Sequence, residues 1–350
     1  ALRRCLMRLT GSPAGRIFFL RERFRHLCLH CRPPRPKMRA VCSQPPSILR
    51  RLSVKDILLA GVDLDADAAL DLLQRLKPER IRYRRSESIM RAEGVEDGAD
   101  LSALQTVASG EEFDVIELPS GLSIKQYRML VSDMDSTLIV NESIDDMAFA
   151  AGCFDEVSDL TRRAMEGAWS FDESLRNRVA CLKGAPSSVL DHAINAERLT
   201  HGADMLMKLC RRNGLCTYVI SGGFSQVCLA AVKKLGMTGA VCNELVMADG
   251  KLTGDVTGPA GGRILNADGK RRAMEILAQT NGVHLSQVIA VGDGANDAEM
   301  ISAAGLGVGF HPKPYLASRA KASIRHGGLE VLAHFFLESW TDAPTLYKRK

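Results

Sequence analysis

The chain has 350 residues, of which 46% are hydrophobic and 25% charged, so it is long enough for two or three domains with ordinary globular composition. Its formal net charge of +5 comes from one end, because a dozen Lys and Arg lie between Ala1 and Arg50 against a single acid, Glu22. The rest of the chain carries a slight excess of acid, and nucleic-acid binding by the folded body is not indicated. No apolar run approaches the roughly 18 residues that a membrane span requires, so we expect no membrane association.

The segment 1–46 is rich in Arg, nearly free of acids and interrupted by prolines, so we expect it to be disordered and to carry no chemistry. Its composition is typical of an organellar transit peptide. Translated upstream sequence with initiation at Met38 is the alternative, which we favour. The expected location is therefore the cytoplasm, with an organelle as the alternative. The ten cysteines of the chain are scattered, as is usual for reduced thiols in a cytosolic protein.

The next part of the chain, 47–122, predicts a small α+β module. Asp65 is a suitable N-cap for a helix whose leucines recur at helical spacing. The predicted elements are a strand at 56–62, a helix at 66–76, a strand at 81–84, a loop at 93–100, a helix at 101–109 and a strand at 113–118. No residue in this module favours a ligand-binding role over a purely structural one.

The apolar run 129–131 is followed by two aspartates, Asp133 and Asp135, with one residue between them. The run predicts a buried strand of a parallel sheet, although periodicity alone leaves a helix segment as the alternative. Ligands of open α/β sheets bind just beyond the carboxyl ends of the strands. Two carboxylates at such a point repel each other unless a divalent cation or a proton lies between them. The pair therefore predicts a polar site, while capping of a turn is the structural alternative.

After Glu142, apolar residues recur at helical spacing as far as about residue 200, which predicts a helical region. The chain then alternates between helices and strands, and this alternation predicts a doubly wound α/β core. The predicted elements are helices at 203–212 and 224–235 and strands at 215–220, 288–291 and 307–310. Asp249-Gly250 predicts the two-residue turn of a β-hairpin, because such turns require positive φ angles.

Three segments in order resemble the motifs of the haloacid dehalogenase superfamily, and of its phosphoserine phosphatase family in particular. They are SDMDSTLIVNE at 132–142, VISGGFS at 219–225 and VGDGANDAEM at 291–300, with Lys270 between the last two. The resemblance covers roughly 125–331. It implies a Rossmann-like α/β core over 123–350, with a helical cap at about 143–200 inserted after the first motif. It also likens 47–122 to the ligand-binding regulatory domains that precede some members.

The resemblance implies a role for each acidic residue of these motifs. Asp133 is expected to attack phosphorus and form an aspartyl-phosphate, and Asp135 to protonate the leaving group and then activate water. Mg²⁺ is the expected cofactor, bound by Asp133, by Asp293 and by the main-chain carbonyl of Asp135. Asp297 is expected to hold Asp293 or Lys270 in place.

The resemblance implies a catalytic role for Ser221 and Lys270, and substrate binding by both together with Gly222 and Asn296. Glycines beside Ser221 let backbone N–H groups approach a phosphate at the start of a helix. Lys270 has four basic rivals in the same region, and the resemblance favours it because it precedes Asp293 by the spacing typical of the family. These rivals are Lys251, Arg263, Arg271 and Arg272.

Recognition of the rest of the substrate is expected on the cap side. The resemblance assigns the substrate ammonium group to Glu142 and its carboxylate to Arg178, while Met165 and Phe171 close the pocket. The expected function is hydrolysis of O-phospho-L-serine, the last step of L-serine biosynthesis. A phosphatase or phosphotransferase for another small phosphomonoester and a non-catalytic protein with a relict fold are the alternatives. The oligomeric state is open, with a homodimer as one alternative.

Overall fold

The computed structural model describes residues 53–61, 64–110, 113–165 and 168–349, except for the side chain of Met165. The segment 1–46 lies outside the described residues, and the expectations of disorder and of a cytoplasmic or organellar location stay predictions. In the described part of the chain, no helix is both long and apolar enough to cross a bilayer.

A seven-stranded sheet forms the centre of the larger domain, in the order β11-β10-β9-β5-β6-β7-β8. All neighbouring pairs are parallel except β7 and β8, which form an antiparallel hairpin. The strands are β5 Met129–Ser132, β6 Cys216–Phe224, β7 Gly239–Ala248, β8 Lys251–Thr257, β9 Val288–Gly292, β10 Leu306–Phe310 and β11 Ala322–Ile324. The hairpin turn is at Asp249-Gly250, both with positive φ, as predicted.

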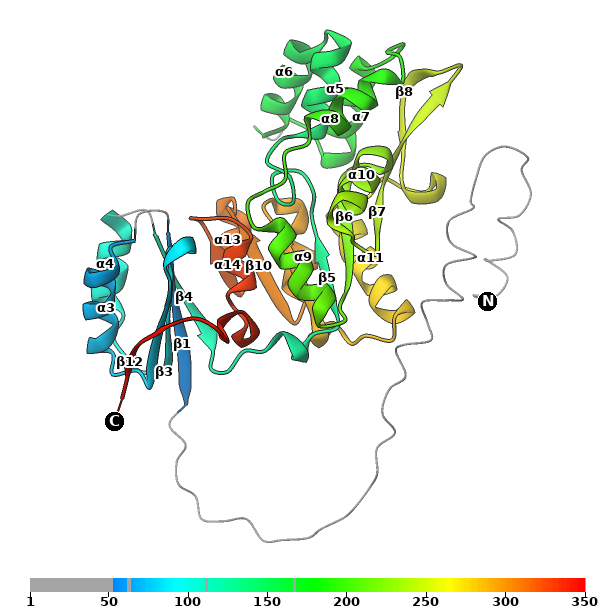
Figure 1. Cartoon of the computed structure of the whole chain (residues 1–350). Coiled ribbons are helices and arrows are strands. Elements are labelled where there is room, and N and C mark those ends of the chain that lie inside the picture. Colours follow the sequence, from blue (N-terminus) through cyan, green and yellow to red (C-terminus); the bar gives the residue numbers. More distant parts are fainter. Residues whose placement is uncertain (1–52, 62–63, 111–112, 166–167, 350) are drawn as a thin grey trace, which may run out of the picture. The chain divides into compact units, whose positions relative to one another are not determined.

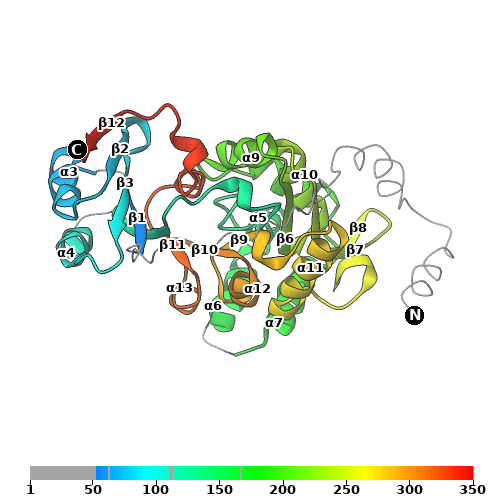
Figure 2. The same cartoon turned by 90° about the horizontal axis from the view of Figure 1, so that it is seen from below.

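Helices cover both faces of this sheet (Figures 1 and 2), which confirms the predicted doubly wound α/β fold. Successive residues of β5 point to opposite faces, so Leu130 packs in one core while Met129 and Val131 pack in the other. The first face is covered by α9 Ala203–Arg212, α10 Ser225–Leu235 and α14 Glu330–Ala333, and the second by α11 Ala267–Thr280, α12 Ala298–Ala303 and α13 Pro314–Ala317.

Four helices follow β5 and form the cap, which lies at the top of Figure 1. They are α5 Ser143–Ala151, α6 Phe154–Met165, α7 Phe171–Cys181 and α8 Ser188–Ala196. The start of α7 is fixed by a capping box, in which Ser170 and Glu173 each satisfy the other's backbone N–H. Helix α5 ends at Gly152 in the left-handed conformation.

The amino-terminal module is a five-stranded antiparallel sheet in the order β12-β2-β3-β1-β4, with two helices. Its elements are β1 Val54–Gly61, α3 Ala66–Arg75, β2 Arg80–Arg84, β3 Ile89–Glu96, α4 Ser102–Gly110, β4 Phe113–Pro119 and β12 Thr345–Lys348. Asp65 caps α3 as predicted. The loop predicted at 93–100 is wrong at its start, because β3 continues through Glu93 to Glu96. The carboxylate of Glu93 forms an ion pair with Arg82 at 3.0 Å.

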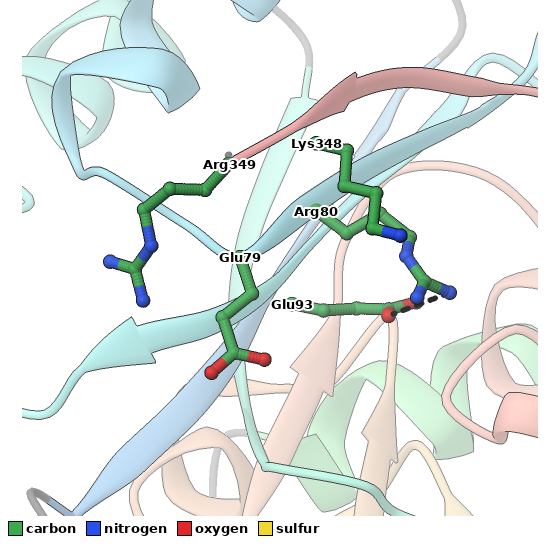
Figure 3. A pocket seen from close by; sticks show the side chains of 5 residues that line it. All are labelled: Glu79, Arg80, Glu93, Lys348 and Arg349. Carbon is green, nitrogen blue, oxygen red and sulfur yellow. Dashed lines mark ion pairs between the residues drawn. The ribbon is translucent and has the colours of Figure 1, made fainter.

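The last strand of the chain, β12, pairs with β2 and so completes the module sheet rather than the larger domain. A cavity of about 290 Å³ lies beside this pairing (Figure 3). Charged side chains line it, namely Glu79, Arg80, Glu93, Lys348 and Arg349. Glu79, Lys348 and Arg349 are exposed, as is usual for charges on a solvated face. A ligand-binding role for the module stays a prediction.

The module and the larger domain share buried polar contacts. Arg91 is fully buried, lies 2.7 Å from Asp56 and donates to the carbonyl oxygens of His334 and Phe335. Asp114 accepts hydrogen bonds from two backbone N–H groups after β11, those of Arg325 and His326. These charges are all paired, as burial requires.

Candidate active site

The site lies where β5, β6 and β9 end, because these three strands are neighbours in the sheet. Asp133 directly follows β5, and its backbone N–H continues the pairing with β9 by donating to the carbonyl of Val291 at 2.9 Å. Ser221 is part of β6, and Asp293 directly follows β9. The sheet topology therefore brings together side chains that are more than 150 positions apart in the chain.

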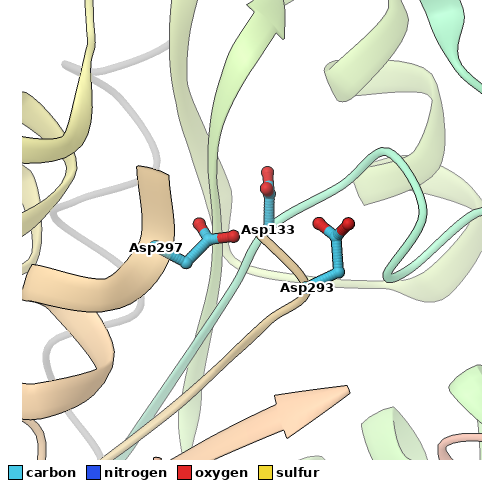
Figure 4. Close-up of side chains that lie close together, drawn as sticks. All are labelled: Asp133, Asp293 and Asp297. Carbon is cyan, nitrogen blue, oxygen red and sulfur yellow. The ribbon is translucent and has the colours of Figure 1, made fainter. Parts of the chain in front are cut away.

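Three buried carboxylates, those of Asp133, Asp293 and Asp297, converge at this edge (Figure 4), with one oxygen of each within 4.8 Å of the others. Burial, and secondarily the charge of Asp133, raise the pKa of Asp293 and bring that of Asp297 to about 7. Such a cluster of hard oxygen donors with excess negative charge is suited to a divalent cation. The residues present therefore fit a metal site.

Lys270 is fully buried beside this cluster, and its Nζ lies 2.7 Å from Asp133 Oδ2 and 2.7 Å from Asp297 Oδ1. Burial alone would lower the pKa of Lys270, but the two carboxylates outweigh it and raise the pKa. Lys270 is therefore a fixed positive charge. Its four rivals, Lys251, Arg263, Arg271 and Arg272, are all exposed.

Asp297 is held from two sides, because it also accepts a hydrogen bond from the backbone N–H of Gly294 at 3.1 Å. With one oxygen on Lys270 and the other on this N–H, Asp297 positions the lysine and the Asp293 turn. Within the described part of the chain, the carboxylate of Asp293 forms one ion pair, with the exposed Lys313 at 3.3 Å. The carboxylate of Asp293 is thus more available to a metal than that of Asp297. Asp133 has a partner on each oxygen, the Met134 N–H on Oδ1 and Lys270 on Oδ2.

Asp135 occupies a different environment from Asp133. Its Oδ1 accepts hydrogen bonds from the backbone N–H of Ser143 at 2.9 Å and from the Ser143 hydroxyl. Burial, and then the charge of Glu142, raise the pKa of Asp135 to about 7. A carboxyl group with a pKa near neutrality can both donate and accept a proton, as general acid–base catalysis requires.

The end of β6 at 221–224, where its pairing with β7 is interrupted, offers groups for an anion and is called the Ser221 loop below. Ser221 is buried, and its Oγ accepts the backbone N–H of Gly223 at 2.9 Å. Helix α10 begins at Ser225, so its amino-terminal end points back to this loop. A Cβ at Gly222 would lie 2.7 Å from Cζ of Phe171, so only glycine allows the cap to approach this closely. Phe171 therefore brings the cap onto the Ser221 loop.

Two charged cap residues are near the site. Glu142 precedes α5, and its Oε1 accepts a hydrogen bond from Ser136 Oγ at 2.9 Å. Arg178 on α7 is half-buried, and its Nε donates to the Ser174 carbonyl at 3.4 Å. Burial lowers the pKa of Arg178, while Glu142 and Asp145 oppose that shift. The structure thus brings Glu142 and Arg178 within electrostatic range of each other.

Asn296 and Met165 are the two remaining predicted site residues. Asn296 is half-buried in the 3-10 helix η5 Ala295–Asp297, and its Oδ1 would lie 2.3 Å from a Cβ at Gly294. It therefore belongs to the same turn as Asp293. The side chain of Met165, expected to close the pocket, lies outside the described residues.

Sequence reasoning missed two asparagines near the site. Asn266 caps α11 by accepting the Gly269 N–H at 3.1 Å, and its Nδ2 donates to Asp172 of α7 at 3.0 Å. Because Asn266 directly precedes the helix start Ala-Asp-Gly-Lys, the sequence indicates an N-cap there. It does not indicate the contact of Asn266 with helix α7. Asn243 on β7 is fully buried and has no comparable local signal.

Residues 127–305 match the haloacid dehalogenase-like hydrolase family. Phosphoserine phosphatase of Streptomyces coelicolor is 43% identical over 241 residues, which are 69% of this chain and 58% of that protein. Phosphoserine phosphatase of Archaeoglobus fulgidus is 40% identical over 241 residues, 69% of each chain. The chain therefore spans less than two thirds of the Streptomyces relative.

A solved structure of a phospho-aspartyl intermediate analogue of phosphoserine phosphatase is 38% identical and has a TM-score of 0.56. The match covers 60% of this chain and 99% of that chain. The family match at 127–305 includes the cap and all the motifs from which the site is built.

Proposed function

Because the chain belongs to the haloacid dehalogenase-like hydrolase family, we propose that it is a Mg²⁺-dependent phosphatase that hydrolyses O-phospho-L-serine to L-serine and phosphate. The observation that carries the proposal is the buried ion pair of Lys270 and Asp133 at 2.7 Å, within a cluster of carboxylates. It supplies a nucleophile and a fixed positive charge at one point. The names of the relatives support the substrate.

The metal would be Mg²⁺, held by Asp133, Asp293 and the main-chain carbonyl of Asp135. When bound, its charge offsets the repulsion between an attacking carboxylate and an anionic phosphate. Asp297 would instead hold Lys270 and the turn of Asp293 in place through its own two hydrogen bonds.

In the first half of the reaction a carboxylate oxygen of Asp133 attacks phosphorus. The new bond joins this oxygen to phosphorus, and the bond between phosphorus and the serine oxygen breaks. Asp135 gives its proton to that oxygen, so that serine leaves as a neutral hydroxyl. The pKa of about 7 allows Asp135 to hold this proton before attack.

In the second half, water attacks phosphorus and releases phosphate from Asp133. Asp135, now ionised, takes the proton of the attacking water and is ready for the next cycle. Lys270, Ser221 and the backbone N–H groups beside it bind the phosphoryl oxygens during both steps. These groups are fixed before charge develops on the phosphoryl oxygens, so they can stabilise the transition state without reorganisation.

The cap would select phosphoserine through its two charged groups. Glu142 is suited to the substrate ammonium group, and the guanidinium of Arg178 can grip the carboxylate with two parallel hydrogen bonds. Phe171, which packs on Gly222, would exclude water from the reacting groups.

The first test is hydrolysis of phosphoserine by the parent protein and by Asp133→Asn, each with Mg²⁺ and with a chelator. We expect the parent to require Mg²⁺ and the variant to lose turnover while keeping its fold, since an amide cannot form the acyl-phosphate. Asp191→Asn, an exposed aspartate of α8, is the matched control and should be fully active. Substantial Mg²⁺-dependent turnover by Asp133→Asn would refute covalent catalysis by this residue.

The second test is a substrate panel of phosphoserine, phosphothreonine and a sugar phosphate. Preference for phosphoserine supports the proposed substrate. Preference for the sugar phosphate would move the assignment to another phosphatase of the family, and absence of hydrolysis throughout the panel would favour a non-catalytic protein.

A further inference from the structure

The pairing of β6 with β7 is interrupted at the Ser221 loop. Ser221 is paired with Cys242, and the next pair joins Phe224 to Asn243, so two residues of β6 have no partner position on β7. These residues are Gly222 and Gly223. The interruption lets the loop leave the sheet, but it also removes the ladder that would hold the carbonyl of Gly222.

The side chain of Asn243 fills this interruption. It is fully buried, its Nδ2 donates to the Gly222 carbonyl at 2.8 Å, and its Oδ1 accepts the backbone N–H of Leu265 at 2.7 Å. The two partners fix the orientation of the amide, because a carbonyl can only accept and an N–H can only donate. One planar side chain thus satisfies two buried backbone groups from different segments.

The two segments that Asn243 joins carry the phosphate-binding groups. Gly222 follows Ser221, and Leu265 precedes Asn266, the N-cap of α11. Lys270 lies near the start of the same helix, and the carbonyl of Asn266 accepts its backbone N–H at 2.8 Å. The amide therefore links the loop of Ser221 to the helix whose lysine contacts Asp133.

We propose that Asn243 is a positioning residue that sets the spacing between the Ser221 loop and the Lys270 helix. It acts through these two elements and does not contact the substrate. The inference rests on the proposed function in one respect, which is that the Ser221 loop and the Lys270 helix both bind a phosphoryl group. A shift of either element would misplace a transition-state contact, to which catalysis is more sensitive than ground-state binding.

Asn243→Asp gives the sharpest test, because its neutral form retains one donor and one acceptor and its ionised form has acceptors only. At low pH the carboxyl group can donate to Gly222 and accept from Leu265. At high pH a carboxylate oxygen faces the Gly222 carbonyl and repels it. We expect the ratio of variant to parental kcat to be near one at low pH and to fall roughly 10-fold or more as the new aspartate ionises.

Asn243→Ala separates positioning from the effect of the added charge. We expect its kcat to be roughly 10–100-fold below the parental value at every pH, while KM for phosphoserine stays within about threefold because the cap contacts remain. If Asn243→Ala does not fold, Asn243→Ser replaces it, since a serine cannot reach both backbone groups. Asn281→Asp is the matched control, because the Asn281 amide also donates to a backbone carbonyl but lies at the far end of α11.

Three outcomes would overturn the proposal: a variant-to-parent ratio for Asn243→Asp that does not change with pH, a parental kcat in Asn243→Ala, or the same pH dependence in Asn281→Asp. All rates are measured with phosphoserine and with p-nitrophenyl phosphate. If only the second ester is hydrolysed, the proposed substrate fails, while the ratios measured with that ester still decide the role of Asn243.

Discussion

The reaction centre and the cap face of the same site are held in place differently. In the centre, Lys270 lies 2.7 Å from each of two carboxylates and all three side chains are buried. On the cap face, Arg178 hydrogen bonds to a carbonyl, and among the described residues it forms no ion pair. Glu142 likewise has a neutral partner, the hydroxyl of Ser136.

This difference separates two tasks. Charges that must be ready before the transition state are fixed against one another, so that no reorganisation is needed during the reaction. Charges that would recognise the proposed zwitterionic substrate form no ion pair among the described residues, and this substrate can supply the partners. Damage to the centre should therefore affect stability and every ester, whereas damage to the cap face should affect discrimination between esters.

The largest effect is expected from Lys270→Met. It removes the positive charge that is proposed to bind the phosphoryl group, so kcat should fall at least about 1,000-fold for any ester. It also leaves Asp133 and Asp297 buried without their cation, which should lower the free energy of unfolding by about 3 kcal/mol. Turnover assays and urea denaturation measure the two effects, and Arg271→Met, an exposed neighbour, is the control. A parental rate in Lys270→Met would show that the buried pair is structural only.

The next effect is expected from Arg178→Ala. Loss of a charged, partly buried partner of the substrate carboxylate should lower kcat/KM for phosphoserine roughly 100-fold. Hydrolysis of p-nitrophenyl phosphate, which has no carboxylate, should change far less. Arg176→Ala on the exposed face of the same helix is the matched control. Equal losses on both esters would mean that Arg178 supports the reaction centre, and the contrast between the two regions would disappear.

The same contrast explains how much of the site the sequence predicts. Asp133 and Asp293 each follow a short apolar run, and strand ends in a parallel sheet meet at one edge. Lys270 is singled out from its basic neighbours by the spacing of a family motif, and the structure adds the reason, since it alone of the five is buried. Short segments with local signals are thus predictable.

Features that depend on distant pairing are not predictable in this way. Strand β12 pairs with β2, which is more than 250 positions away, and nothing in its own four residues indicates a partner. Asn243 is an ordinary residue of β7 until the interruption in its pairing with β6 is known. The continuation of β3 through Glu93 to Glu96 is hidden by acidic residues and a glycine, which resemble a loop when the partners of Glu93, Arg80 and Arg82, are unknown.

A smaller effect is expected from Asp172→Ala, which breaks a contact between the two regions. Asp172 of the cap accepts a hydrogen bond from Asn266, the N-cap of the helix that carries Lys270, at 3.0 Å. Without it the closed cap is less favoured, so KM for phosphoserine should rise roughly 3–10-fold, the scale of one hydrogen bond. Steady-state kinetics measure the change, with Asp191→Ala on α8 as the control. An unchanged KM would show that this contact does not hold the cap closed.

The smallest effect on turnover is expected from His334→Gln, because His334 lies outside both the reaction centre and the cap face. This substitution tests how pH changes the free energy of unfolding. His334 is buried where the larger domain meets the module, and its ring contacts Trp340 and the hydroxyl of Ser339. Burial, and then the charge of Arg84, lower the pKa of His334 from 6.5 to about 4.

The sign of the effect follows from proton binding. Between pH 6.5 and about 4 the unfolded chain binds a proton at His334 that the folded chain does not, so the free energy of unfolding falls as pH falls through this window. The loss is on the order of 3 kcal/mol in all. Glutamine does not titrate, so between pH 7 and pH 5 the parent should lose more stability than His334→Gln, as measured by urea denaturation. Exposed His284→Gln should behave like the parent. A parental pH dependence in His334→Gln would show that His334 is not the source of the acid sensitivity. The carboxyl groups of Asp135 and Asp297 would not be the source either, because their raised pKa values stabilise the fold as pH falls.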